Sequence, residues 1–243
     1  MDILVLTATA FEQDALKRSI SHPATRTFAH RPRTEGILGT RRVALIETGI
    51  GAVNTAQALT AALETGPPDF VLQIGVGGAY ARSRLNVGDL AVATEENDGE
   101  TGVLAPDGWH PADLIGIPVL SKNLDHYNRF PLDAVLARRA ATMLLNARPD
   151  GTSAVRFGPF VTVQQCSGLA ARGNELASRF NAICENMEGA AAAHVCALYE
   201  VPFIELRGIS NLVEDRNTAT WKLPLASGNA QRAARVLIAD LAP

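Results

Sequence analysis

Short apolar runs alternate along the chain with longer segments in which apolar residues recur at helical spacing. The short runs are rich in Val and Ile, whereas the longer segments are rich in Ala and Leu. Strands that are buried on both faces of a parallel sheet have this continuous apolar character, and crossover helices connect them. The pattern therefore predicts an α/β fold built on a mainly parallel sheet.

The same pattern places the individual elements along the chain. We predict strands over residues 2–6, 42–47, 70–75, 89–94, 155–163, 182–185 and 202–208. We predict helices over residues 11–19, 53–65, 132–146, 168–179, 189–200 and 225–241. Residues 95–131 are rich in Gly, Pro, Asp and Asn and lack periodicity, so we expect a long connection there. Connections of this length in compact domains are usually functional loops or lids.

Composition and charge narrow the class of protein. The 243 residues are 47% hydrophobic and 19% charged, which allows one large core and predicts a single domain over residues 1–243. The net charge is −3 and Lys and Arg are scattered, so a nucleic-acid partner is not expected. No window approaches the roughly 18 apolar residues of a membrane span, so we expect a soluble, cytoplasmic protein without a membrane partner. The Cys and His residues show no metal-ligand spacing, so we expect no metal and no cofactor.

The residues that follow the predicted strands are the first candidates for a site, because ligands of open parallel sheets bind beyond the carboxyl ends of the strands. These ends carry the runs TATAFEQD, TGIGAVN, GVGGAY, ENMEGAA and GISNLVEDRN. The run IGVGGA at residues 74–79 is neither a dinucleotide fingerprint nor a P-loop, so its glycines indicate a tight turn or a close approach to a ligand. Asn211 is typical of an exposed turn and equally of a binding site.

Two glutamates stand out among these residues. Glu188 begins an Ala-rich helix, where the helix dipole stabilises an anion, so it could accept hydrogen bonds from sugar hydroxyls or cap the helix together with Glu185. Glu12 lies in the first turn after the first strand, where it could cap a helix or act as a base for water. Two carboxylates in one cleft, one binding hydroxyls and one activating water, are consistent with hydrolysis of a glycosidic bond.

Taken together, Glu12, the GIG corner, IGVGGA, ENMEGAA and VPFIELRGISN resemble the nucleoside phosphorylase and nucleosidase superfamily in their order and spacing. The resemblance covers nearly the whole chain, and ENMEGAAAAHVCALYEVPF is its most specific motif. Within the superfamily the chain looks similar to the methylthioadenosine/S-adenosylhomocysteine nucleosidases and, in that neighbourhood, to the futalosine hydrolases. The resemblance implies a single-domain three-layer α/β sandwich, with a central twisted, mixed and largely parallel sheet flanked by helices. It also implies a homodimer and a purine nucleoside as the small-molecule substrate.

The resemblance assigns roles to residues of this chain. Glu12 would polarise the attacking water, Glu188 would accept hydrogen bonds from the ribose hydroxyls, and Met187, which could equally be a core residue, would line the sugar. Further substrate-binding residues would be Ile50, Val76, Gly77, Gly78, Phe160 and Val161. Phosphorylases of the superfamily hold phosphate with arginines near the first glycine loop, but TATAFEQD and TGIGAVN contain none. Hydrolysis is therefore preferred over phosphorolysis.

Asn211 determines the expected substrate, because it stands where the methylthioadenosine enzymes have an aspartic acid that protonates N7 of the purine. The Asn211 carbonyl can accept a hydrogen bond from protonated N7 while its NH2 group donates to a 6-oxo group, whereas the 6-amino group of adenine would meet a donor. Mispairing of buried polar groups can discriminate between two substrates by a factor on the order of a hundred. The substitution therefore favours a 6-oxopurine nucleoside, and the resemblance implies hydrolysis of futalosine to hypoxanthine and dehypoxanthine futalosine in an alternative menaquinone pathway. A methylthioadenosine/S-adenosylhomocysteine nucleosidase, another purine nucleosidase and a non-catalytic nucleoside-binding protein are the alternatives.

The benzoate end of futalosine would need a cation or a set of hydrogen-bond donors. Arg216, Asn128 and Arg129 are the candidates for this contact. A solvated side chain is the other interpretation of each.

Overall fold

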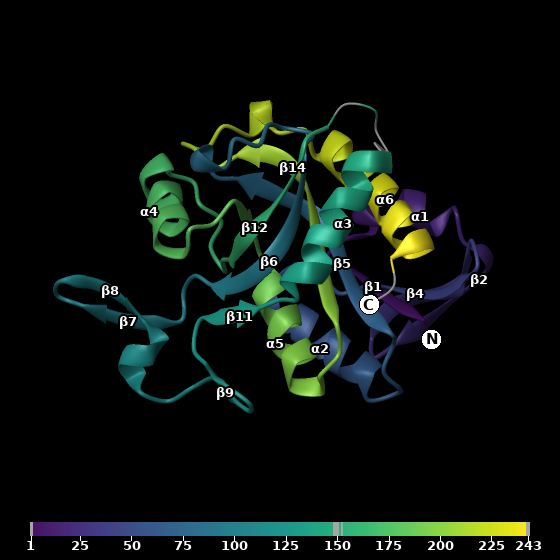
Figure 1. The fold of residues 1–243 in the computed structure, drawn as a ribbon, viewed down its shortest axis with the longest axis horizontal. Helices are drawn as coiled ribbons and strands as arrows, with labels where there is room; N and C mark the ends of the chain where they lie inside the picture. Colours follow the sequence, from purple (N-terminus) through teal and green to yellow (C-terminus); the bar gives the residue numbers. More distant parts are fainter. Residues whose placement is uncertain (1, 148–150, 152, 242–243) are drawn as a thin grey trace.

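A ten-stranded mixed sheet runs through the computed structural model, which describes residues 2–147, 151 and 153–241 (Figure 1). The seven predicted strands are all present, as β1 (Ile3–Thr7), β4 (Arg41–Glu47), β5 (Phe70–Ala79), β6 (Leu90–Asp98), β12 (Val155–Thr162), β13 (Cys184–Asn186) and β14 (Phe203–Leu212). Parallel pairs join β4 to β1, β1 to β5, β5 to β14, and β12 to both β6 and β13. The antiparallel pairs of β13 with β5 and of β14 with β6 make the sheet mixed. The predicted fold class is confirmed.

Helices cover both faces of this sheet. They are α2 (Ala52–Leu63), α3 (Ala134–Ala147), α4 (Ala170–Phe180), α5 (Gly189–Tyr199) and α6 (Leu223–Asp240). Side chains alternate along β1, so Ile3 and Val5 pack with α3 and α6 while Leu4 and Leu6 pack with α2 and α5. Figure 1 shows α3 beside α6 and α2 beside α5, which form the two outer layers. None of the described helices is long and apolar enough to cross a membrane.

Residues 95–131 were predicted to form one long connection without periodic structure, and this prediction is wrong. Its first residues extend β6, and the rest forms β7 (Gly102–Ala105), β8 (Gly108–Pro111), the 3-10 helix η3 (Ala112–Ile115), β9 (Leu120–Ser121), β10 (Asp125–His126) and β11 (Arg129–Pro131). Strands β7 and β8 form one small hairpin and β9 and β10 form another, while β11 joins the edge of the main sheet. Elements of two to four residues are too short to show periodicity in the sequence.

The prediction also missed a hairpin and misjudged the first helix. Strands β2 (Ser21–Phe28) and β3 (Arg31–Leu38) extend the sheet, and β2 is almost entirely exposed at its edge, so it carries no apolar alternation. The predicted helix at residues 11–19 is instead the 3-10 helix η1 (Ala10–Glu12) followed by one turn, α1 (Asp14–Lys17). The backbone of Gln13, at φ −124° and ψ −8°, separates the two. Further 3-10 turns are η2 (Ala81–Ser83) and η4 (Thr218–Thr220).

A bulge at the end of β14 turns the chain toward the predicted site. Ile209 pairs with Gly77 and Asn211 pairs with Gly78, so Ser210 is the extra residue between two paired positions. Such a bulge re-aims the side chains that follow it. Asn211 is thereby brought beside the glycine-rich end of β5.

The close approach of β14 to α6 depends on Gly208. A Cβ atom at this position would lie 2.1 Å from the backbone oxygen of Ala226, and a backbone atom cannot move aside as a side chain can. We expect Gly208→Ala to lower the free energy of unfolding by about 1–3 kcal/mol, measured by urea denaturation.

Gly228→Ala in α6 is the matched control for this substitution. Its Cβ would meet only the end of the Arg232 side chain at 3.3 Å, and alanine favours a helix over glycine by about 0.8–1 kcal/mol. Equal unfolding free energies for the two variants would contradict the proposed close packing.

Candidate active site

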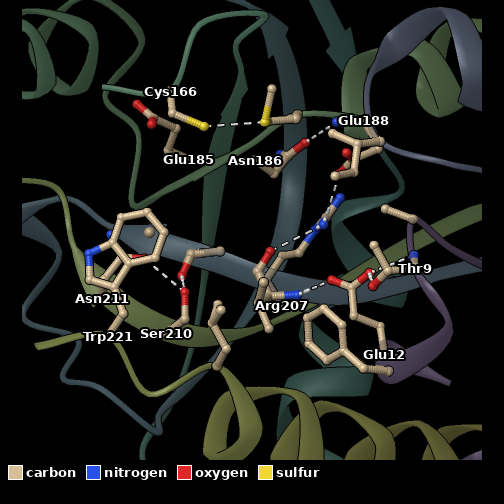
Figure 2. Close-up of a pocket in the computed structure, with 18 of the residues that line it drawn as sticks. Thr9, Glu12, Cys166, Glu185, Asn186, Glu188, Arg207, Ser210, Asn211 and Trp221 are labelled. Atoms are coloured by element: carbon tan, nitrogen blue, oxygen red, sulfur yellow. Dashed lines mark hydrogen bonds and ion pairs between the residues drawn. The ribbon is translucent and has the colours of Figure 1, made fainter. Parts of the chain in front are cut away.

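A cavity of about 260 Å³ lies at the ends of β1, β5 and β14, beside the N-terminus of α5 (Figure 2). The predicted site residues that line it are Glu12, Ile50, Val76, Gly77, Gly78, Met187, Glu188 and Asn211. Figure 2 shows Glu12 and Glu188 toward one end and Asn211 toward the other, with Arg207 between them. Residues far apart in the sequence therefore meet where the strand-end rule expects a ligand.

Two predicted binding residues lie outside this cavity. Phe160 and Val161 are fully buried inside β12, where they pack in the hydrophobic core. The structure does not bring these two residues to the cavity, because they precede the end of β12 and lie between the paired strands β6 and β13. The chain reaches the cavity a few residues later, at Cys166 and Ser167.

The three candidates for an anionic substrate tail also lie outside the cavity. Asn128 is buried, and its amide bonds the backbone of Asp98, Thr101 and Ala112. Arg129 forms an ion pair with Glu95. Arg216 is exposed, but its guanidinium lies 4.7 Å from the ring centre of Trp221, which does line the cavity. Arg216 is thus the one of the three that lies at the rim.

The Glu12 carboxylate is held by hydrogen bonds on both oxygens. Oε2 accepts from the backbone N–H (3.0 Å) and the hydroxyl (2.8 Å) of Thr9, and Oε1 accepts from the backbone N–H of Val76 (2.9 Å). The first contact is the capping box of η1, so the capping role that the sequence suggested is present. The same carboxylate is 4% exposed and lines the cavity, so capping and a role at the site coexist.

Arg207 is a site residue that the sequence analysis missed. Its side chain is 2% exposed, and it donates through Nη1 to Glu188 Oε2 (3.2 Å) and through Nε to Glu205 Oε1 (2.8 Å). Glu188 also accepts from the backbone N–H of Gly51 (3.0 Å), where φ is +94° and glycine is favoured. The signal in the sequence was the pair of charged residues within the otherwise apolar strand FIELRGIS.

A buried carboxyl pair lies behind Arg207. Burial and the neighbouring Glu205 raise the pKa of Glu96 well above its usual value, and Glu205 is the carboxyl group of the pair that contacts Arg207. Glu96 accepts from Asn186 Nδ2 (2.6 Å), and Asn186 Oδ1 accepts from the backbone N–H groups of Glu188 and Gly189. This network holds Glu188 at the N-terminus of α5.

Burial also raises the pKa of Glu12, while Arg207 and the Val76 N–H act in the opposite direction. A carboxylate with a raised pKa is a better proton acceptor near neutral pH than an exposed one. Among the described residues, no three His, Cys, Asp or Glu side chains are grouped as a metal ion would require.

The amide of Asn211 is fixed in one orientation. Nδ2 donates to the backbone carbonyl of Leu212 (3.0 Å), which can only accept, so Oδ1 is the atom that faces the hydroxyl of Ser210 (2.7 Å). One lone pair on Oδ1 and one N–H on Nδ2 remain for a ligand.

The chain matches a known protein family over almost its whole length. The family model of the phosphorylase superfamily matches residues 2–239. The chain belongs to this superfamily. It is 34% identical over 206 residues to a futalosine hydrolase of Thermus thermophilus, covering 84% of each protein. It is 34% identical to a futalosine hydrolase of Streptomyces coelicolor, covering all of this chain and 96% of that protein. A 5'-methylthioadenosine/S-adenosylhomocysteine nucleosidase of Anoxybacillus flavithermus is 29% identical, covering 91% of this chain and 90% of that protein.

Solved structures support the fold of this superfamily member. The 5'-methylthioadenosine/S-adenosylhomocysteine nucleosidase of Neisseria meningitidis, in complex with methylthio-immucillin-A, superimposes with a TM-score of 0.83 at 23% identity, covering 98% of each chain. The nucleosidase of Colwellia psychrerythraea, in complex with adenine, gives 0.85 at 20% identity, covering 100% of this chain and 96% of that one. The predicted enzyme class, a hydrolase of N-glycosyl bonds, is confirmed by the named sequence relatives.

Proposed function

We propose that this nucleosidase hydrolyses the N-glycosidic bond of futalosine, releasing hypoxanthine and dehypoxanthine futalosine for menaquinone biosynthesis. The observation that carries the proposal is the fixed amide of Asn211. Its remaining lone pair and its remaining N–H lie on the two atoms bonded to Cγ, a pairing that matches protonated N7 and the 6-oxo group of hypoxanthine. The two futalosine hydrolases among its relatives support the same substrate.

The opposite end of the cavity suits the ribose. Glu188 is anchored by Gly51 and Arg207 and presents a carboxylate to the cavity, where it would accept hydrogen bonds from two sugar hydroxyls. As the C1'–N9 bond lengthens, positive charge develops on the sugar, and the nearby carboxylates stabilise it. Glu12 would take a proton from the water that attacks C1', N7 would take a proton from solvent, and the C1'–N9 electron pair would stay with the base, so hypoxanthine leaves neutral.

The charges that line the cavity favour water over phosphate as the nucleophile. Among the described lining residues, Glu12, Glu185 and Glu188 supply three carboxylates and Arg207 supplies the one guanidinium. Arg207 is already paired with Glu188 and Glu205. A phosphate dianion would therefore be repelled more than it is attracted.

Direct assay of futalosine tests the proposal. Purified protein is incubated with futalosine with and without inorganic phosphate, and the bases and sugars are separated by chromatography. We expect hypoxanthine and a free sugar at the same rate in both reactions. No hypoxanthine at high enzyme concentration would rule out futalosine as the substrate, and a sugar phosphate would contradict hydrolysis.

The pH dependence of kcat/KM should reveal the raised pKa of Glu12. The base must be ionised to accept a proton, so activity falls as the pH drops through the pKa of Glu12. Because burial raises this pKa, we expect the acid limb of the profile to have its midpoint above 4.5, the ordinary value for glutamate. A profile that stays flat down to pH 4.5 would contradict the assignment of Glu12 as the base.

We also propose that the enzyme is a cytoplasmic homodimer. The apolar side chains of Val53 on α2 and Leu198 on α5 are 82% and 48% exposed and line one surface groove, which supports a protein partner on that side. The mass in solution, measured by light scattering, should be twice the 25.8 kDa of the chain.

A further inference from the structure

Glu185 is a cavity-lining carboxylate that takes no part in the bond-breaking and proton-transfer steps of the proposed reaction. It is 7% exposed, and it lies near Cys166 on the opposite side of the cavity from Asn211 and Trp221 (Figure 2). We propose that Glu185 accepts a hydrogen bond from N1–H of the 6-oxopurine and is a second residue that determines base specificity. The inference rests on the proposed function, because it assumes a purine between Glu185 and Asn211.

Glu185 accepts all three of the hydrogen bonds that the structure gives its side chain. Oε1 accepts from the backbone N–H of Ser167 (2.9 Å), and Oε2 accepts from the Ser167 hydroxyl (2.6 Å) and from the Tyr80 hydroxyl (3.1 Å). Burial and Glu185 itself raise the pKa of Tyr80 well above its usual value, so Tyr80 remains a donor. An ionised carboxylate offers about four acceptor positions, and three are occupied. One remains for a ligand.

The position of this acceptor complements that of Asn211. In hypoxanthine, N7, the 6-oxo group and N1–H follow one another around the edge of the base. An amide that contacts N7 and the 6-oxo group at one side of the cavity leaves N1–H directed farther along the same edge. Asn211 and Glu185 line one cavity from two sides, so the two residues together could read all three groups.

The chemistry at N1 separates the two common purine bases. Hypoxanthine carries a hydrogen on N1 and can donate to a carboxylate, and a charge-assisted hydrogen bond of this kind is stronger than a neutral one. Adenine carries a lone pair on N1, which an ionised Glu185 would repel. Glu185 would thus reject adenine independently of Asn211.

A purely structural role for Glu185 makes a different prediction. Its bonds to Ser167 tie down the loop that borders the cavity, so loss of this tie alone would weaken every ligand similarly. Glu100 offers a matched control, because its carboxylate accepts from the backbone N–H of Gln165 (3.2 Å) in the same loop and does not line the cavity.

Binding of hypoxanthine and adenine to the intact protein, measured by calorimetry, distinguishes the two roles. In Glu185→Gln the amide adds a donor where the wild type has only acceptors. We expect the dissociation constant of hypoxanthine to rise by roughly 10–100-fold while that of adenine stays the same or falls. Glu100→Gln should keep the wild-type preference for hypoxanthine.

Three results would overturn the inference: equal weakening of both bases in Glu185→Gln, no change in either, or a wild type that does not prefer hypoxanthine. Failure of the proposed function would be seen separately, as absence of futalosine turnover by the wild type. The base-binding comparison would still decide the role of Glu185 in that case.

Discussion

Glu12→Gln is expected to lower kcat for futalosine by roughly 10³-fold, within the usual range for loss of a general base. The amide has no ionisable group to take the proton of the attacking water. Backbone N–H groups of Thr9 and Val76 donate to the two carboxylate oxygens of Glu12. In the variant, the new NH2 group must face one of these N–H donors and cannot accept its hydrogen bond. We therefore also expect a loss of about 1–2 kcal/mol in stability, and thermal unfolding must be followed alongside the kinetics.

Two measurements separate lost chemistry from lost structure in this variant. Hypoxanthine binding should remain within a few-fold of wild type, and the acid limb of the pH profile should disappear from the residual activity. Asp14→Asn is the matched control, because Asp14 is an exposed acid in the adjoining helical turn and does not line the cavity. Equal kcat values for Glu12→Gln and wild type would exclude Glu12 as the base.

Asn211→Asp is expected to shift base preference by at least about 100-fold toward a 6-aminopurine. The matched substrates are futalosine and its 6-amino counterpart, which differ only in the base. A carboxylate oxygen would repel the 6-oxo group but accept from a 6-amino group. Asn211 Nδ2 donates to the carbonyl oxygen of Leu212, and in the variant a carboxylate oxygen would face this carbonyl instead. The repulsion favours the protonated carboxyl group of the new aspartate, which can donate its proton to N7.

The ratio of kcat/KM for the two substrates measures this shift. Asn217→Asp is the control, since Asn217 caps η4 through its side-chain oxygen, which aspartate also provides, and it is exposed outside the cavity. An unchanged ratio in Asn211→Asp would show that Asn211 does not read the base.

The fold was largely predictable because buried parallel strands have a strong signature in the sequence. The apolar runs located β1, β5 and β14, and the rule that ligands lie beyond strand ends led to Glu12, Glu188 and Asn211. The hairpin of β2 and β3 was not predicted, because β2 is an exposed edge strand and its sequence has no apolar alternation.

The missed site residues had weaker local signals. Arg207 looked like an internal strand residue, and only its burial between Glu188 and Glu205 reveals its position. Cys166, Ser167 and Trp221 lie in irregular segments, where no periodicity fixes the alignment of chain and cavity. The resemblance placed Phe160 and Val161 at the site instead, in the run FGPFVTVQQ, which departs from the usual sequence of the nucleosidases. Local sequence therefore located the acids and the amide, but not the walls of the cavity.

Competition between futalosine and 5'-methylthioadenosine in one reaction tests the central claim most directly. The two substrates are supplied at equal, limiting concentrations, and the released hypoxanthine and adenine are quantified over the first few per cent of turnover. Since the proposed contacts of Asn211 and Glu185 with the base both oppose adenine, we expect hypoxanthine to exceed adenine by about 100-fold or more. Adenine released as fast as hypoxanthine, or faster, would contradict the assignment of this protein as a 6-oxopurine nucleosidase.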